Sequence, residues 1–245
     1  MRSDEFINLI TKRTQTEDER NTLRAGLPLG YDSVENTVVA FRGDVASVYR
    51  HVCVTGIRKT AFIKRLLVTL SCLYNKDEAN VLVLSPKTEY AELLHLNGLD
   101  VTVPYIRDKA DLENAMLCVK ELVGQFALGK KCKKLFLVLD GVDELSGCNV
   151  NGDLSENREF LDLIARKKEV TLISGTDLIK SIFSGYPGAY VGIGNCLVTT
   201  REDGKADVTY VGEDSALTMP APISYPCQPS FTETLIAFNA ERKGE

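Results

Sequence analysis

The stretch that decides the fold is HVCVTGIRKTAFIKRLLVTLSCLY, residues 51–74. Val52–Thr55 is a continuous apolar run that ends at a glycine, which is typical of a buried strand. Arg58–Tyr74 follows at once, and its apolar side chains occupy most of the helical circumference: Phe62, Ile63, Leu66, Leu67, Leu70 and Leu73. Such a helix is expected to pack against a sheet on one side and against another layer on the other. The sequence therefore predicts a buried strand, a tight turn and a buried helix.

The turn between this strand and helix has the outline of a phosphate-binding loop, but it is too short. In the pattern G-x-x-x-x-G-K-[ST], the Lys follows the first Gly by about six positions, because the amides between them must curl around the phosphates. Gly56 and Lys59 are only three apart, and no second Gly precedes Lys59. Gly56, Lys59 and Thr60 are therefore interpreted as a vestigial nucleotide site. The simpler alternative is an ordinary Lys-Thr pair at the start of a helix.

A second signal is the apolar run Leu135–Leu139, which ends in Asp140 within LFLVLDGVDEL. In P-loop proteins such a strand presents its carboxylate beside the first strand, where it holds a magnesium ion through water. The acid that commonly follows it to polarise the attacking water is replaced by Gly141, and Asp143 and Glu144 come only after Val142. We therefore interpret Asp140 as the retained member of the vestigial site. Taken alone, it is also what a polar turn after a strand looks like.

The rest of the chain alternates strands and helices. Predicted strands are Thr37–Phe41, Val81–Leu84, Asp100–Val103, Val170–Ser174 and the hairpin Asn195–Thr200 with Asp207–Val211; predicted helices are Glu89–His95, Asp108–Phe126, Ser155–Arg166 and Thr176–Ser184. This alternation predicts an α/β fold, with a mainly parallel sheet, helices on both faces and an antiparallel hairpin at one edge. Residues 1–25 are expected to form a linker or N-terminal helical arm, and residues 26–245 the domain.

Composition excludes several classes of function. The net charge of −5 argues against a nucleic-acid-binding domain, which usually carries a basic stripe. The seven cysteines form no C-x-x-C pair, and those within apolar runs (Cys53, Cys72 and Cys118) are expected to be reduced core thiols. His51 and His95 lie near no cysteine pair, so a zinc site is not expected. No apolar window reaches the ~18–20 residues that a membrane span needs.

The last third of the sequence contains candidate surface segments. Gly185–Gly194 is rich in glycine and aromatic residues. It is interpreted as a loop with an edge strand, or alternatively as a groove that presents Tyr186 and Tyr190 to a partner peptide. The Pro-rich residues 218–231 are expected to run extended over the surface.

Taken together, these segments resemble an FtsK/SpoIIIE-type ATPase module. The residues that carry the resemblance are LPLGYDSVENTVVAF, HVCVTG with KTAFIKRLL, NVLVLSPK, LFLVLDGVDEL and GNCLVTTREDGKADVTYVG, within about residues 26–212. The arrangement is most similar to the C-terminal module of the EssC/EccC coupling proteins of type VII secretion. The resemblance implies a RecA-like P-loop NTPase fold whose nucleotide site has degenerated, because three loop residues and the second acid are missing.

The resemblance also implies a function for the chain. It predicts a non-catalytic module, without ATP or magnesium, that recognises small helical WXG-type or other type VII secretion substrates. Its other predicted partners are neighbouring ATPase modules, within a homo-oligomeric protein that is anchored in a bacterial membrane with this part in the cytoplasm. Two alternatives remain open: a working NTPase or DNA translocase whose unusual loop recruits Arg58 or Lys64, and an α/β scaffold that only packs within a larger chain.

Overall fold

The computed structural model describes residues 23–24, 27–32, 37–41, 51–96, 98–127, 133–142, 167, 169–175, 195–211, 216–218 and 223–224. Its strands are β1 (Leu27–Asp32), β2 (Thr37–Phe41), β3 (His51–Gly56), β4 (Ala79–Leu84), β5 (Asp100–Thr102), β6 (Lys134–Leu139), β7 (Val170–Ser174), β8 (Asn195–Thr200), β9 (Lys205–Val211), β10 (Ala216–Thr218) and β11 (Ile223–Ser224). Its helices are α3 (Lys59–Leu73), α4 (Lys109–Ala127) and the 3-10 helix η1 (Thr88–His95).

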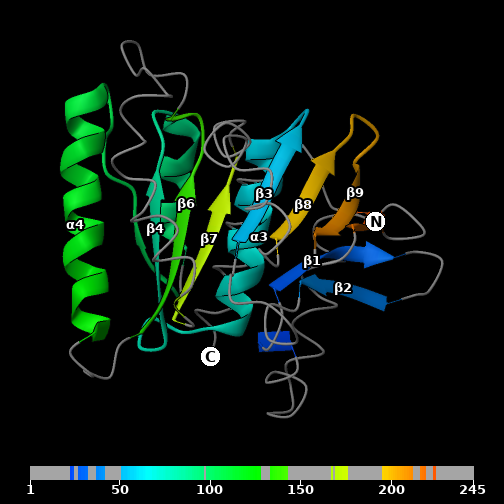
Figure 1. Cartoon of the computed structure of the whole chain (residues 1–245), viewed down its shortest axis with the longest axis horizontal. Coiled ribbons are helices and arrows are strands. Elements are labelled where there is room, and N and C mark those ends of the chain that lie inside the picture. The colour runs from blue at the N-terminus through cyan, green and yellow to red at the C-terminus, as the bar shows by residue number, and fades with distance from the viewer. Residues whose placement is uncertain are drawn as a thin grey trace.

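The described strands form one sheet in the order β2-β1-β11-β9-β8-β3-β7-β6-β4-β5, with β10 also paired to β9 (Figure 1). The run from β8 to β5 is parallel. The predicted hairpin of β8 and β9 is confirmed as an antiparallel pair. It does not end the sheet, because β11, β1 and β2 continue it beyond β9 with antiparallel pairing.

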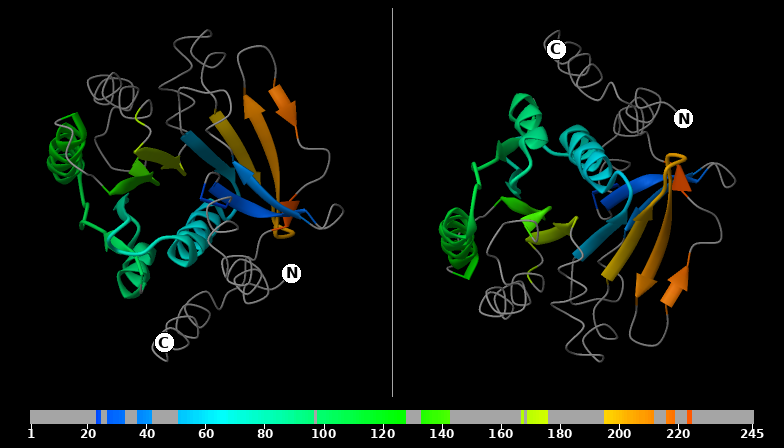
Figure 2. Two further views of the ribbon diagram at one scale, coloured as in Figure 1. Left: turned by 90° about the horizontal axis from the view of Figure 1, so that it is seen from below. Right: turned by 90° about the horizontal axis from the view of Figure 1, so that it is seen from above.

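The helices cover both faces of the parallel part. The connection from β3 through α3 leads towards the β5 edge, whereas the connection from β5 through α4 leads back to β6. Parallel crossovers are right-handed, so two crossovers in opposite directions place their helices on opposite faces. Figure 2 shows α3 and α4 on different sides of the strands between them. The α/β RecA-like fold predicted from the sequence is confirmed.

Helix α3 is buried along almost its whole length, as its apolar circumference predicts. Every residue from Phe62 to Leu73 is buried, and the helix packs against β3 and β8 and also against β1. The polar residue Arg65 is tolerated there because it donates a hydrogen bond to the Leu29 carbonyl of β1 and stacks over Phe62, 4.6 Å from the ring centroid. Arg65 therefore connects β1 to α3.

The cysteine prediction is correct for two of the three named residues. Cys53 and Cys72 are buried free thiols, but Cys118 is exposed. The reason is helical register: α4 buries Leu112, Met116 and Val119 at a spacing of three and four residues, which turns position 118 to solvent. In the described residues, no helix is long and apolar enough to cross a bilayer.

Candidate functional site

The candidate site lies where the carboxyl ends of the parallel strands meet. In open α/β sheets, ligands bind at this edge, next to the point where the connections change direction. Here β3 ends at Gly56, β4 leads into Ser85, Asp140 follows β6 and Gly175 follows β7. Because β7 lies between β3 and β6, the strand that ends at Asp140 does not pair with β3, although its carboxylate reaches the start of α3. The helix after β3 spans this gap.

Thr60 and Asp140 are brought together, as predicted from their positions. Thr60, in the first turn of α3, donates a hydrogen bond from Oγ1 to Asp140 Oδ2 at 2.8 Å. Asp140 has no exposed surface, and its backbone N–H donates to the Leu84 carbonyl of β4 at 3.2 Å. A hydroxyl from the phosphate-binding loop and an aspartate at the end of an apolar strand are the pair that holds Mg²⁺ in P-loop ATPases.

Two further side chains contact this carboxylate that sequence reasoning did not assign. Lys87 Nζ lies 3.3 Å and 3.2 Å from the two carboxylate oxygens of Asp140 and 3.0 Å from Thr60 Oγ1. Tyr90 donates its phenol proton to Asp140 Oδ2 at 2.8 Å. We call Thr60, Lys87, Tyr90 and Asp140 the Asp140 cluster. The only sequence signal for it was that Lys87 follows β4, which turned out to be the neighbour of β6.

The electrostatics of the cluster favour protonated donors around one anion. Burial, together with the negative charge of Asp140, raises the pKa of Tyr90 well above its ordinary value of 10.0. The phenol therefore stays a hydrogen-bond donor at neutral pH. A buried carboxylate is costly unless it is paired and hydrogen-bonded, and here three protein donors satisfy it.

The predicted loop residues Gly56 and Lys59 take no part in the cluster. Gly56 has a φ of 90°, and Arg58 also adopts a left-handed conformation with a φ of 64°, so the chain turns from β3 into α3 within two residues. A Cβ at Gly56 would collide with the Thr200 carbonyl oxygen and lie 3.1 Å from the Thr200 nitrogen. Thr200 also donates from Oγ1 to the Thr55 carbonyl at 2.9 Å and to the Ile57 carbonyl. The end of β8 thus holds the short turn in place.

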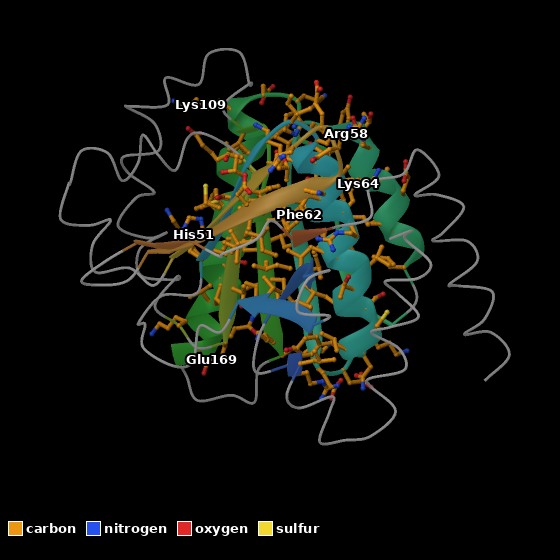
Figure 3. All side chains as sticks on the ribbon, turned by 90° about the vertical axis from the view of Figure 1, so that its right-hand side faces the viewer. His51, Arg58, Phe62, Lys64, Lys109 and Glu169 are labelled. Carbon is orange, nitrogen blue, oxygen red and sulfur yellow. The ribbon has the colours of Figure 1, made fainter. Side chains whose placement is uncertain are left out.

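The basic residues near this turn differ in burial and in their ion-pair partners. Lys59 is half-buried and forms no side-chain hydrogen bond or ion pair with any residue that the structure describes. Lys64 is buried on α3 and pairs with Glu92 of η1, 3.1 Å away. Figure 3 shows Arg58 at the start of α3 and Lys64 further along the helix. The Lys64 ammonium, which the alternative nucleotide site would recruit, is therefore already engaged in an ion pair within the protein.

The geometry of the cluster does not fit a magnesium ion. Mg²⁺ requires six ligands at about 2.0–2.1 Å and keeps several waters. Both oxygens of Asp140 already accept bonds from protein donors, and Gly175 lies so close that a Cβ there would be 2.8 Å from Asp140 Cγ. Nor do the described residues contain a group of three or more His, Cys, Asp or Glu placed to hold a metal.

A separate cavity of about 240 Å³ opens beside the cluster, between the β4–η1 turn and the chain after β5. We call it the groove, and its lining is Ser85, Pro86, Lys87, Thr88, Ala91, Leu94, Val103, Pro104 and Tyr105. Leu94 and Tyr105 are 54% and 73% exposed, which is high for large apolar side chains. The predicted partner residues Tyr186 and Tyr190, the acids Asp143 and Glu144, and the helices predicted within 155–184 lie outside the described residues.

Comparison with known proteins supports the fold. No family model matches the sequence, and no curated protein matches it either. A solved structure described as an ATPase is 12% identical, with a TM-score of 0.60 over 92% of this chain and 95% of that one. EccC from Thermomonospora curvata (ATPases 2 and 3, in complex with a signal sequence peptide) is 11% identical, with a TM-score of 0.61. EssC from Geobacillus thermodenitrificans (ATPases 2 and 3) is 13% identical, with a TM-score of 0.53.

The similarity to EccC and EssC covers 83% of this chain but only 41% of each of theirs. The chain therefore spans about two fifths of the solved secretion-ATPase chains that it resembles. At this level of identity the comparison concerns the fold. The chain has the α/β RecA-like fold of these ATPase structures, which is the fold that the sequence resemblance implied.

Proposed function

We propose that this chain is a degenerate, non-catalytic ATPase module of a type VII secretion coupling protein, which recognises a secreted protein or packs against neighbouring modules. The observation that carries the proposal is the Asp140 cluster. The carboxylate that would face a magnesium nucleotide is fully buried and bonded to Lys87, Thr60 and Tyr90. The turn that would cradle the phosphates is three residues shorter than the pattern requires.

The similarity to type VII secretion ATPases supports the cellular role. The EccC structure contains ATPases 2 and 3 with a signal sequence peptide, and another similar structure is that of the cytoplasmic domain of EccC. By analogy, this module would act in the cytoplasm as part of a larger membrane-anchored homo-oligomer, next to further ATPase modules.

Nucleotide binding is tested by calorimetric titration of the purified protein with ATP and Mg²⁺. We expect no saturable heat and no phosphate release, with wild type and Lys59→Ala behaving alike. Saturable binding with turnover, lost in Lys59→Ala, would contradict the proposal and favour the working NTPase.

For substrate recognition, we assign the groove as the binding site for an apolar segment of a secreted WXG-type protein. Its volume of about 240 Å³ is below the ≈ 300–1,000 Å³ of sites that enclose a small-molecule ligand, so it suits one or two anchoring side chains. The partly exposed Leu94 and Tyr105 at this groove give the apolar contact that such an anchor requires.

The chain offers a matched control for this assignment. Leu117 lies on α4 and is 55% exposed, against 54% for Leu94, but it does not line the groove. Fluorescence anisotropy with a labelled WXG-type protein should show binding weakened about tenfold or more by Leu94→Asp and unchanged by Leu117→Asp. Equal affinity of the two variants would place the binding surface elsewhere.

A further inference from the structure

Lys87 occupies the position at which a P-loop ATPase would hold its metal ion. A magnesium ion in such a site lies between the hydroxyl at the helix start and the aspartate carboxylate that follows an apolar strand. Here the Lys87 ammonium lies between Thr60 Oγ1, at 3.0 Å, and the two Asp140 oxygens, at 3.3 Å and 3.2 Å. One cationic group of the chain thus contacts both of the groups that would coordinate the metal.

The charge balance of the cluster makes a metal unnecessary. Asp140 is fully buried, while the Lys87 side chain retains 20% of its surface exposed. A carboxylate has about four acceptor positions, and an ammonium has three donors and no acceptor. With Tyr90 and Thr60 each adding a hydrogen bond to Oδ2, the carboxylate is neutralised and hydrogen-bonded entirely by the chain.

Lys87 lies in the turn that follows β4, and from there its side chain reaches Asp140. Its backbone N–H donates to Ser85 Oγ at 3.2 Å, which shapes the turn, and η1 begins at the next residue. Because β4 and β6 are paired in parallel with Leu84 opposite Leu139, the residues after them emerge side by side. The loop lysine, Lys59, begins α3 instead and has no described partner.

We propose that Lys87 is a built-in cation that replaces the divalent metal at Asp140 and keeps the site closed. This inference rests on the proposed function, since it explains how the module holds an ATPase fold without magnesium nucleotide. With Lys87 in place both Asp140 oxygens are engaged and the cluster does not fit a metal ion; without the Lys87 ammonium, the Asp140 and Thr60 oxygens are expected to bind a divalent cation in its place.

The test compares thermal unfolding of wild type, Lys87→Met and the double variant Lys87→Met/Asp140→Asn, in EDTA and in millimolar Mn²⁺ as the probe metal. Methionine keeps the unbranched stem that lines the groove while removing the charge. In EDTA we expect Lys87→Met to lower the Tm by on the order of 10 °C, because Asp140 is left as a buried, unpaired anion.

Mn²⁺ should restore about 5–10 °C of this loss if it reaches ~100-fold its Kd. Wild type and the double variant should not respond, because one already has its cation and the other lacks the anion. If Lys87→Met needs Mn²⁺ to refold at all, recovery of folded protein with and without the ion becomes the measurement, and recovery only with Mn²⁺ supports the proposal.

Two results would overturn the inference. One is a Lys87→Met protein that gains no stability and no refolding yield from Mn²⁺; the other is a wild type stabilised by Mn²⁺ as much as the variant. Either can occur whether or not the wild type binds ATP. Failure of this inference is therefore distinguishable from failure of the proposed non-catalytic role, which saturable ATP binding with turnover by the wild type would contradict.

Discussion

The Asp140 cluster and the groove share Lys87 of the turn Ser85–Thr88, and they differ in which side chains they leave exposed. In the cluster, polar groups that an ATPase would offer to a ligand are bonded to each other and buried. In the groove, apolar side chains such as Leu94 and Tyr105 stay exposed although a packed core would bury them. The polar groups of the cluster are therefore already hydrogen-bonded within the protein, whereas the apolar side chains of the groove remain free to contact a partner.

The largest expected effect is the loss of the cation in the cluster. Lys87→Met should reduce the free energy of unfolding by about 3–5 kcal/mol, since breaking a buried ion pair leaves an uncompensated charge. Lys59→Met is the matched control and should change it by less than about 0.5 kcal/mol. Urea unfolding followed by circular dichroism measures both. Equal losses in the two variants would show that Lys87 contributes no more to the free energy of unfolding than Lys59 does.

Next in size is removal of the Tyr90 hydroxyl. Tyr90→Phe should cost about 1.5–3 kcal/mol, the usual range for a hydrogen bond to a charged group. The folded protein holds the phenol proton more tightly than the unfolded chain, because the pKa of Tyr90 is raised. Its stabilisation is therefore complete below pH ~10 and is lost as the pH rises towards the folded pKa.

The measurement is urea unfolding between pH 8 and 11 (about 2 units below and 1 above the unfolded pKa of ~10). Wild type should lose stability more steeply than Tyr90→Phe above pH ~10. If the two proteins lose free energy of unfolding equally as the pH rises, the Tyr90 phenol does not stabilise the buried Asp140 carboxylate.

A smaller effect is expected from filling the space beside Asp140. A Cβ at Gly175 would lie 2.6 Å from Ile63 Cδ1 and 2.8 Å from Asp140 Cγ, so Gly175→Ala should cost about 1–3 kcal/mol. Gly124, on the exposed side of α4, has nothing within 4 Å of such a Cβ. Gly124→Ala should instead stabilise the protein by about 0.4–1 kcal/mol. Thermal unfolding of both variants decides whether the cluster is as tightly packed as its distances indicate.

The smallest effect on stability is expected at the groove. Leu94→Ala and Leu117→Ala should both change the free energy of unfolding by less than about 0.5 kcal/mol, because each side chain is more than half exposed. Urea unfolding checks this, and a large loss in Leu94→Ala alone would mean that the groove is part of the core rather than a free surface.

Much of the architecture could be predicted from the sequence because it depends on local patterns. The apolar runs of β3, β6 and β7 and the apolar circumference of α3 are set by neighbouring residues, and the structure confirms each within one or two positions. The start of the helix predicted from Asp108 is also close to that of α4, which Asp108 caps: its Oδ1 accepts a hydrogen bond from the Asp111 backbone N–H at 3.0 Å. The prediction that Cys118 is buried was wrong because an apolar run does not show which side of a helix a residue faces. The spacing of the buried residues on α4 does.

The candidate site was predictable only in part, for a physical reason that Thr60 and Lys87 illustrate. By itself the sequence determined that the loop at Gly56 is short, that Thr60 begins a helix and that Asp140 ends a strand. Only the tertiary structure decided that β7 separates β3 from β6 and that β4 adjoins β6. That order brings Lys87 to a carboxylate 53 positions away in the chain, because the contacts at a sheet edge depend on which strands pair and not on the distance along the sequence.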